Sequence, residues 1–103
     1  MSRTLKIAVV DDEPDMRESI SQWLALSGFD AETFATAEEA LKAIGADWPG
    51  VVISDIRMPG MDGMAFLKRL MGIDSGLPVI MITGHGDVPM AVEAMRIGAM
   101  DFM

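Results

Sequence analysis

Short apolar segments alternate along this chain of 103 residues with segments in which apolar residues recur at helical spacing. Three of the apolar segments, 5–10, 51–54 and 79–82, are nearly continuous, which is typical of strands buried on both faces of a parallel sheet. The segment 30–34 alternates polar and apolar residues and suits an edge strand. Since repeated strand–helix units form a parallel sheet covered by helices on both faces, the sequence predicts one α/β domain with a doubly wound sheet.

Each of the four amphipathic segments has a start signal and a stop signal. Apolar residues recur at helical spacing at Met16, Ile20, Trp23 and Leu24; at Ala37, Ala40, Leu41 and Ile44; at Met64, Leu67 and Met71; and at Val88, Ala91, Val92 and Met95. The start signals are Pro14, the capping-box pair Thr36 and Glu39, Asp62, and Asp87. A glycine follows each stripe and predicts a left-handed helix end: Gly28, Gly45, Gly72 and Gly98.

Charge and composition exclude several classes of function. Sixteen acidic residues against eight basic ones give a net charge of -8, which would repel the nucleic-acid backbone. The chain has no cysteine, so disulfides and cysteine-ligated zinc sites are excluded. The first apolar run meets Asp11 and Asp12 too early for a signal peptide or a membrane span. We therefore expect a cytoplasmic domain that contacts neither nucleic acid nor membrane directly.

Acidic side chains and one hydroxyl follow the predicted strands. Asp11 and Asp12 come after the first strand, Asp55 after the third and Thr83 after the fourth. In doubly wound sheets the binding site lies outside the carboxyl ends of the strands, so these groups should converge. A single acidic residue at a strand end often only caps the next helix or faces solvent. The joint pattern is more specific and favours a functional site.

Three carboxylates held close together need a compensating charge. Mg²⁺ suits such a site, because it takes one or two carboxylates, keeps waters and leaves room for a phosphoryl oxygen. Asp55 on the central strand is the candidate nucleophile for a phosphoryl group, since an aspartate carboxylate can form an acyl phosphate. Thr83 is placed to donate its hydroxyl to the phosphoryl oxygens, and Gly84 allows a close backbone approach.

Three motifs carry a resemblance to a known family: Asp11-Asp12-Glu13; Ser54-Asp55-Ile56-Arg57-Met58-Pro59-Gly60-Met61-Asp62-Gly63; and Thr83-Gly84-His85-Gly86. With them the chain resembles, over residues 1–103, the receiver domain of bacterial two-component response regulators. The stretch 82–103 is most similar to receivers of transcriptional regulators, including the C4-dicarboxylate-transport type that acts at σ54-dependent promoters. The resemblance implies a flavodoxin-like (βα)5 fold with strand order 2-1-3-4-5.

The resemblance also implies a role for individual residues. Asp55 matches the phosphoacceptor, which receives a phosphoryl group from a sensor histidine kinase. Asp12 and Asp55 match side-chain ligands of Mg²⁺, with Asp11 acting through water and the backbone carbonyl of Arg57 completing the set. Thr83 matches the switch hydroxyl, and Phe102 matches the switch aromatic.

At the level of the whole protein, the resemblance implies a signalling switch without a turnover substrate. Such a domain catalyses its own phosphorylation and dephosphorylation. It controls an output domain outside this chain, expected to be a DNA-binding transcription activator. A homodimer through the face formed by the fourth helix and the fifth strand is also implied, and on that helix Val88, Met90 and Met95 are the residues of interest.

The end of the sequence departs from the family pattern. A family lysine follows the switch aromatic by three residues, whereas this sequence stops at Met103, one residue after Phe102. We therefore expect a C-terminally truncated receiver that ends in strand five and lacks the fifth helix. Two expectations follow: slow or uncoupled phosphorylation, and self-association through the exposed edge.

Two other functions compete with the switch. An aspartyl-phosphate phosphohydrolase would also use a strand-end aspartate and Mg²⁺, but it needs a carboxylate two residues after the nucleophile, where this chain has Arg57. A pseudo-receiver would bind partners without phosphorylation; the complete acid set disfavours it, and the missing lysine keeps it open. His85, the only histidine, is a poor candidate for a metal ligand or a phosphodonor.

Overall fold

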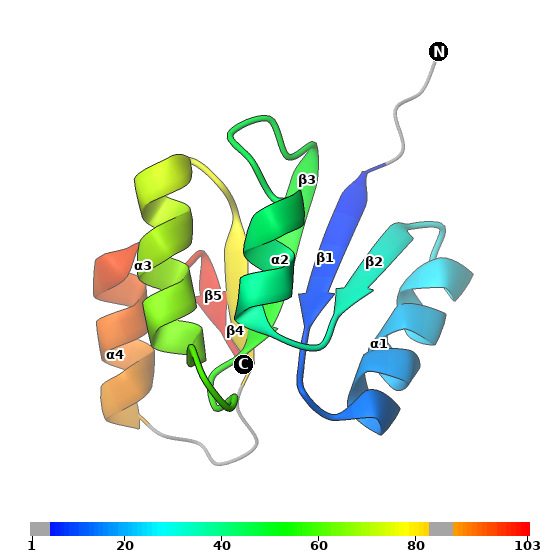
Figure 1. Ribbon diagram of the computed structural model, residues 1–103, viewed down its shortest axis with the longest axis horizontal. Helices are drawn as coiled ribbons and strands as arrows, with labels where there is room; N and C mark the ends of the chain where they lie inside the picture. The colour runs from blue at the N-terminus through cyan, green and yellow to red at the C-terminus, as the bar shows by residue number, and fades with distance from the viewer. Residues whose placement is uncertain (1–4, 83–87) are drawn as a thin grey trace.

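A parallel sheet of five strands forms the middle of the molecule (Figure 1). The computed structural model describes residues 5–82 and 88–103. The strand order is β2-β1-β3-β4-β5, as the family resemblance implies. The strands are β1 (Lys6–Val10), β2 (Asp30–Phe34), β3 (Gly50–Asp55), β4 (Val79–Ile82) and β5 (Asp101–Phe102). The partly exposed β2 lies at one edge, which confirms the interpretation of its alternating pattern.

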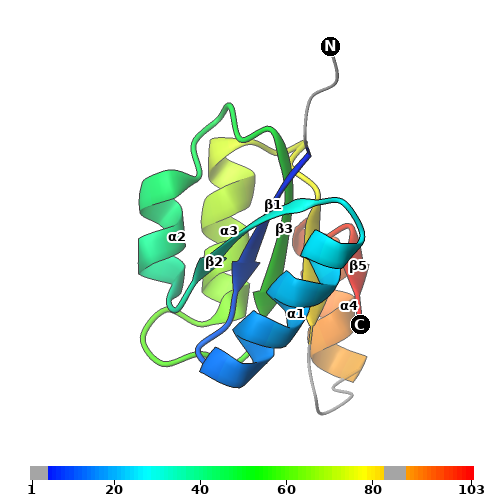
Figure 2. The ribbon, with the colours of Figure 1, turned by 90° about the vertical axis from the view of Figure 1, so that its right-hand side faces the viewer.

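Helices cover both faces of the sheet, so the fold is the doubly wound one expected. The described residues contain the helices α1 (Pro14–Leu26), α2 (Ala37–Ala43), α3 (Gly63–Ile73) and α4 (Val88–Ile97). Figure 2 shows α1 on the opposite side of the sheet from α2 and α3, and α4 packs beside α3. None of these helices has the length and apolar character needed to cross a membrane.

Alternate residues of the strands build two cores. Ala8 and Val10 of β1 belong to the larger core, which α2, α3 and α4 cover. Ile7 and Val9 face the other way and pack with Leu24 of α1. The strand period of two therefore divides one apolar run between both faces of the sheet. Burial of each large apolar side chain contributes about 1.5–3 kcal/mol, so both faces stabilise the arrangement.

The predicted helix starts are confirmed where the structure describes them. Pro14 begins α1, the Thr36 hydroxyl accepts a hydrogen bond from the Glu39 N–H at 3.1 Å, and the Asp62 carboxylate accepts one from the Ala65 N–H at 2.9 Å. Side-chain oxygens thus satisfy free N–H groups at the first turns of α2 and α3. Asp87 lies outside the described residues.

Two of the four predicted glycine helix ends are wrong. Gly28 and Gly98 have positive φ angles of 89° and 139° and end α1 and α4 as predicted. Gly72 instead lies inside α3, which continues to Ile73. Gly45 lies just after the end of α2 but does not have a positive φ, so the predicted left-handed end is absent there. Ile44, which is buried in the larger core, ends α2 in an extended conformation.

The predicted apolar stripe of α1 is also partly wrong. Leu24 is buried and Ile20 is partly buried, but Trp23 is 66% exposed and Met16 is 45% exposed. The described residues supply no second helix beside α1 on its face of the sheet, so the flanks of the stripe remain in solvent. Trp48, by contrast, packs against the larger core.

Candidate functional site

The register of the parallel strands brings three carboxylates together at the carboxyl edge of the sheet. Val10 of β1 is aligned with Ser54 of β3, so Asp11 and Asp55 occupy equivalent positions on neighbouring strands. Each of Asp11, Asp12 and Asp55 offers a carboxylate oxygen within 4.8 Å of the other two. The predicted convergence of these three residues, called the acid cluster below, is therefore present in the structure.

Short hydrogen bonds hold two of these carboxylates in place. The Oδ1 atom of Asp11 accepts the N–H of Glu13 at 2.9 Å, and Oδ1 of Asp55 accepts the N–H of Ile56 at 2.8 Å. The Nη1 atom of Arg17 donates to the backbone oxygen of Asp11 at 2.8 Å. Sequence reasoning missed Arg17, because its contact depends on how α1 is oriented against the loop after β1.

The carboxyl group of Asp11 is electrostatically destabilised in its charged form by this arrangement. Its pKa is raised above the ordinary value, first by burial and then by the charges of Asp55, Asp12 and Glu13; the hydrogen bond from the Glu13 N–H opposes the shift. A divalent cation would remove this repulsion. Three oxygen donors within reach of one ion form the hard ligand set that Mg²⁺ takes, so the residues present fit this metal.

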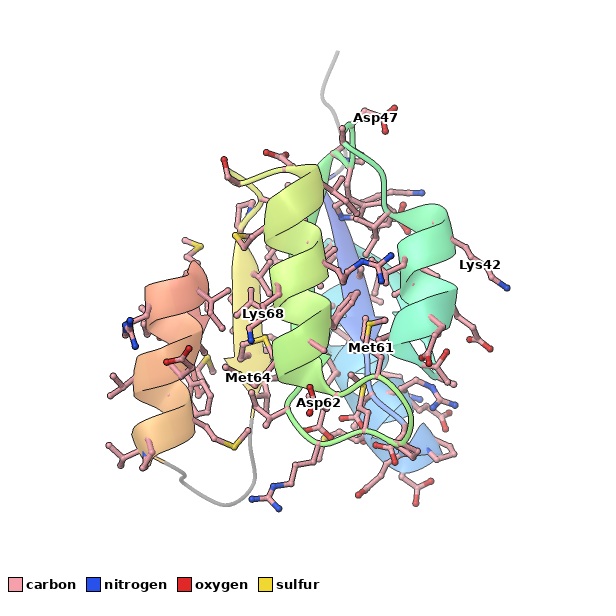
Figure 3. The ribbon with its side chains drawn as sticks, turned by 60° about the vertical axis from the view of Figure 1, so that its left-hand side comes forward. Lys42, Asp47, Met61, Asp62, Met64 and Lys68 are labelled. Atoms are coloured by element: carbon pink, nitrogen blue, oxygen red, sulfur yellow. The ribbon has the colours of Figure 1, made fainter. Side chains whose placement is uncertain are left out.

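The loop between β3 and α3, residues 56–62, borders the acid cluster. Ile56 and Met58 are buried, and the N–H of Gly63 donates to the backbone oxygen of Ile56 at 2.8 Å, so both ends of the loop are tied to the core. Figure 3 shows the loop below α3, with Met61 and Asp62 labelled. A groove of about 530 Å³ lies beside the loop and is lined by Ile56, Arg57, Met58, Pro59, Asp62 and Met90.

The structure describes only part of the predicted switch. Phe102 is aligned with Met81 of β4, is half-buried and packs against the larger core. Arg57 lies on the loop two residues after Asp55, with its side chain exposed. Thr83, Gly84 and His85 lie outside the described residues.

A second groove, of about 580 Å³, lies between α4 and β5. It is lined by Ala91, Val92, Met95, Arg96, Asp101 and Phe102. Val88, Val92 and Met95 expose 68%, 56% and 47% of their surfaces on this helix. Met90 instead packs against the larger core, so two of the three residues singled out on the helix, Val88 and Met95, contribute to its outer face.

Comparison with known proteins gives consistent matches. Residues 7–103 match the family model described as the response regulator receiver domain. The chain is 50% identical, over its full length, to the C4-dicarboxylate transport transcriptional regulatory protein DctD of Rhizobium meliloti. It is 46% identical over 97 residues, 94% of the chain, to the transcriptional regulatory protein FixJ of Bradyrhizobium diazoefficiens.

Solved structures agree with the architecture. A response regulator receiver domain protein from Clostridium thermocellum has a TM-score of 0.91 and 34% identity; the match covers 96% of this chain and 80% of that one. The FixJ-N crystal structure has a TM-score of 0.85 and 43% identity, and the match covers 98% of this chain and 81% of that one. Among the curated relatives, the chain spans 22% of the length of DctD and 47% of the length of FixJ.

Proposed function

Because the chain belongs to the response regulator receiver family, we propose that it is a phosphorylation-dependent switch whose phosphoacceptor is Asp55. The observation that carries this proposal is the acid cluster at the carboxyl edge of the sheet, with Asp55 on the central strand. The phosphodonor is the phosphohistidine of a sensor histidine kinase. The domain is not a metabolic enzyme; its chemistry is confined to its own phosphorylation and dephosphorylation.

Phosphoryl transfer would use the carboxylate of Asp55, whose orientation the fold fixes. An oxygen of Asp55 attacks the phosphorus atom, the bond from phosphorus to the donor nitrogen breaks, and the product is an acyl phosphate. The hydrogen bond from the Ile56 N–H to Oδ1 fixes the orientation of the carboxyl group before the attack. Asp11, Asp12, Asp55 and the backbone carbonyl of Arg57 would hold Mg²⁺. When bound, the ion offsets the charge of the incoming phosphoryl group.

The switch residues act after transfer. Thr83 donates its hydroxyl to the phosphoryl oxygens, and Phe102 changes rotamer as the region around Thr83 moves. The half-buried position of Phe102 beside β4 and α4 supports this role, because a side chain at that place can link the carboxyl edge of β4 to the outer face of α4. Phosphorylation thereby shifts an existing equilibrium between two conformations.

The partners follow from the same family. The relatives DctD and FixJ are transcriptional regulatory proteins at least twice as long as this chain, which supports control of a transcription-activating output domain. The site of action is the cytoplasm. The exposed apolar face of α4 with β5 supports a homodimer at that surface.

The competing functions fit the structure less well. The phosphohydrolase hypothesis needs an acid two residues beyond the nucleophile, and Arg57 occupies that position. The pseudo-receiver hypothesis does not require three converging carboxylates, whose mutual repulsion is costly without a bound cation. Phosphorylation explains the acid cluster most directly.

Intact-mass spectrometry tests the proposal. The wild-type chain and the Asp55→Asn variant are incubated with acetyl phosphate, with and without Mg²⁺. We expect one phosphoryl adduct that needs both Mg²⁺ and Asp55. An adduct that persists in Asp55→Asn would assign the acceptor to another residue, and the absence of any adduct on the wild type would favour the pseudo-receiver.

A further inference from the structure

Glu38, in the first turn of α2, contacts the loop that follows the phosphoacceptor. Its Oε2 atom accepts a hydrogen bond from the N–H of Met61 at 3.4 Å, across 23 positions of the sequence. The same oxygen lies 3.0 Å from the place where a Cβ at Gly60 would be. Two neighbouring residues of the loop therefore lie against one carboxylate, and Figure 3 shows Met61 between the lower ends of α2 and α3.

The contact falls on the outermost part of the loop. Both ends of the loop are fixed by buried residues and by the hydrogen bond from Gly63 to Ile56. Gly60, at the outer part, has a φ of 75° and exposed surface, and such a turn has little to hold it except bonds to a neighbouring element. Glu38 supplies such a bond from a helix that packs on the same core.

The position of Glu38 is set by the helix start. The Thr36 hydroxyl caps α2, and Glu38 lies two residues later, within the first turn. Its neighbour Glu39 also lies in the first turn, but its carboxylate turns back and accepts the N–H of Ala35 at 3.4 Å. Two adjacent acidic residues thus do different things: Glu39 stabilises the helix start, and Glu38 reaches the loop.

We propose that Glu38 is a positioning residue of the phosphoryl site, which holds the outer part of the loop 56–62 so that the backbone carbonyl of Arg57 stays in place for Mg²⁺. This inference rests on the proposed function, because it assigns the Arg57 carbonyl to the metal. Glu38 acts through the backbone and touches neither metal nor phosphoryl group. Linkage makes the effect reciprocal: a loop held by Glu38 binds Mg²⁺ more tightly, and bound Mg²⁺ strengthens the contact.

The test compares four forms of the chain: wild type, Glu38→Ala, Glu38→Gln and Glu39→Ala. Mg²⁺ affinity is measured by isothermal titration calorimetry, and exchange of the Met61 amide hydrogen is measured by NMR. Glu38→Gln keeps an acceptor oxygen without the charge. Glu39→Ala removes an equal charge from the same helical turn and leaves the loop contact intact.

We expect Glu38→Ala to weaken Mg²⁺ binding about two- to tenfold, the range of one net hydrogen bond, and to speed exchange of the Met61 amide. Glu38→Gln should recover most of both losses, and Glu39→Ala should leave both near wild type. Equal weakening in Glu38→Ala and Glu39→Ala would overturn the inference, since charge alone would explain it. Wild-type affinity in Glu38→Ala would also overturn it, while the proposed function would stand. If neither the wild type nor any variant binds Mg²⁺, the proposed function itself fails.

Discussion

Gly63 begins α3 directly against the backbone carbonyl of Asp55: a Cβ at Gly63 would lie 2.2 Å from that oxygen. It would also lie 2.7 Å from Cα of Ile56, so the obstacle is backbone and not a side chain that could rotate away. The absence of a side chain at this one position lets the helix start directly against the backbone of Asp55, the proposed phosphoacceptor. The closeness of loop and strand therefore depends on residue 63 being glycine.

The first prediction concerns this contact. Gly63→Ala should lower the free energy of unfolding by about 2 kcal/mol or more, because the added methyl group must displace backbone atoms. Gly72→Ala is the matched control in the same helix. No atom lies within 4 Å of its Cβ position, so it should stabilise the fold by about 0.5 kcal/mol through helix propensity. Urea denaturation of both variants measures the two changes in the free energy of unfolding, and equal changes would contradict the steric explanation.

A second prediction concerns the buried carboxylate of Asp11. Asp11→Asn keeps the Oδ1 acceptor for Glu13 and removes a repelled charge, so in EDTA it should raise the free energy of unfolding. A higher Tm in thermal denaturation is the expected readout. With Mg²⁺ the wild type should be the more stable of the two, because it gains binding energy that the variant lacks.

The same effect has a defined pH dependence. Because the pKa of Asp11 is raised in the folded state, stability falls as the pH rises from the ordinary carboxyl pKa through the raised one, and the whole cost is present above the raised pKa. The advantage of Asp11→Asn should therefore be present at neutral pH and vanish below the ordinary carboxyl pKa of 3.8. Asp15→Asn, an exposed change in the first turn of α1, serves as the control and should show no stabilisation. A less stable Asp11→Asn at neutral pH in EDTA would refute the repulsion argument.

A third prediction separates a metal ligand from a nearby charge. Asp12→Ala should weaken Mg²⁺ binding at least about tenfold and slow phosphorylation by acetyl phosphate in parallel. Asp15→Ala removes a charge from the same end of the molecule but lies outside the acid cluster, so both properties should stay near wild type. Calorimetry and intact-mass kinetics provide the two readouts. Unchanged phosphorylation in Asp12→Ala would remove Asp12 from the site.

A fourth prediction addresses the proposed dimer. Val92→Asp places a charge in the groove between α4 and β5 and should weaken self-association at least about tenfold in sedimentation velocity experiments. Leu26→Asp changes an even more exposed apolar residue, 88% accessible, on α1, and should leave association unchanged. Both forms are measured before and after phosphorylation. If Leu26→Asp has the larger effect, the dimer uses the α1 side instead.

The sequence alone predicted most of the helices and strands and the acid cluster, and the strand order came from the family resemblance. Strand and helix periodicities predicted the parallel sheet. A strand covered by helices on both sides needs a continuous apolar run, whereas a helix that packs on the sheet with one side needs only an apolar stripe. The positions of Asp11, Asp12 and Asp55 after their strands predicted the acid cluster, since parallel strands end at one edge of the sheet. These are local signals, and the predictions made from them are correct where tertiary packing favours the same structure.

Only the tertiary structure decided how separate elements meet. The end of α2 at Ala43 falls where Ile44 enters the larger core, and α3 continues past Gly72 to Ile73, so neither helix ends at a left-handed glycine as the local signal predicted. The contact between Glu38 and Met61 joins residues 23 positions apart, and the hydrogen bond from Arg17 to Asp11 depends on the orientation of α1. Residue type and spacing encode what a segment forms, whereas such contacts exist only after the segments have packed.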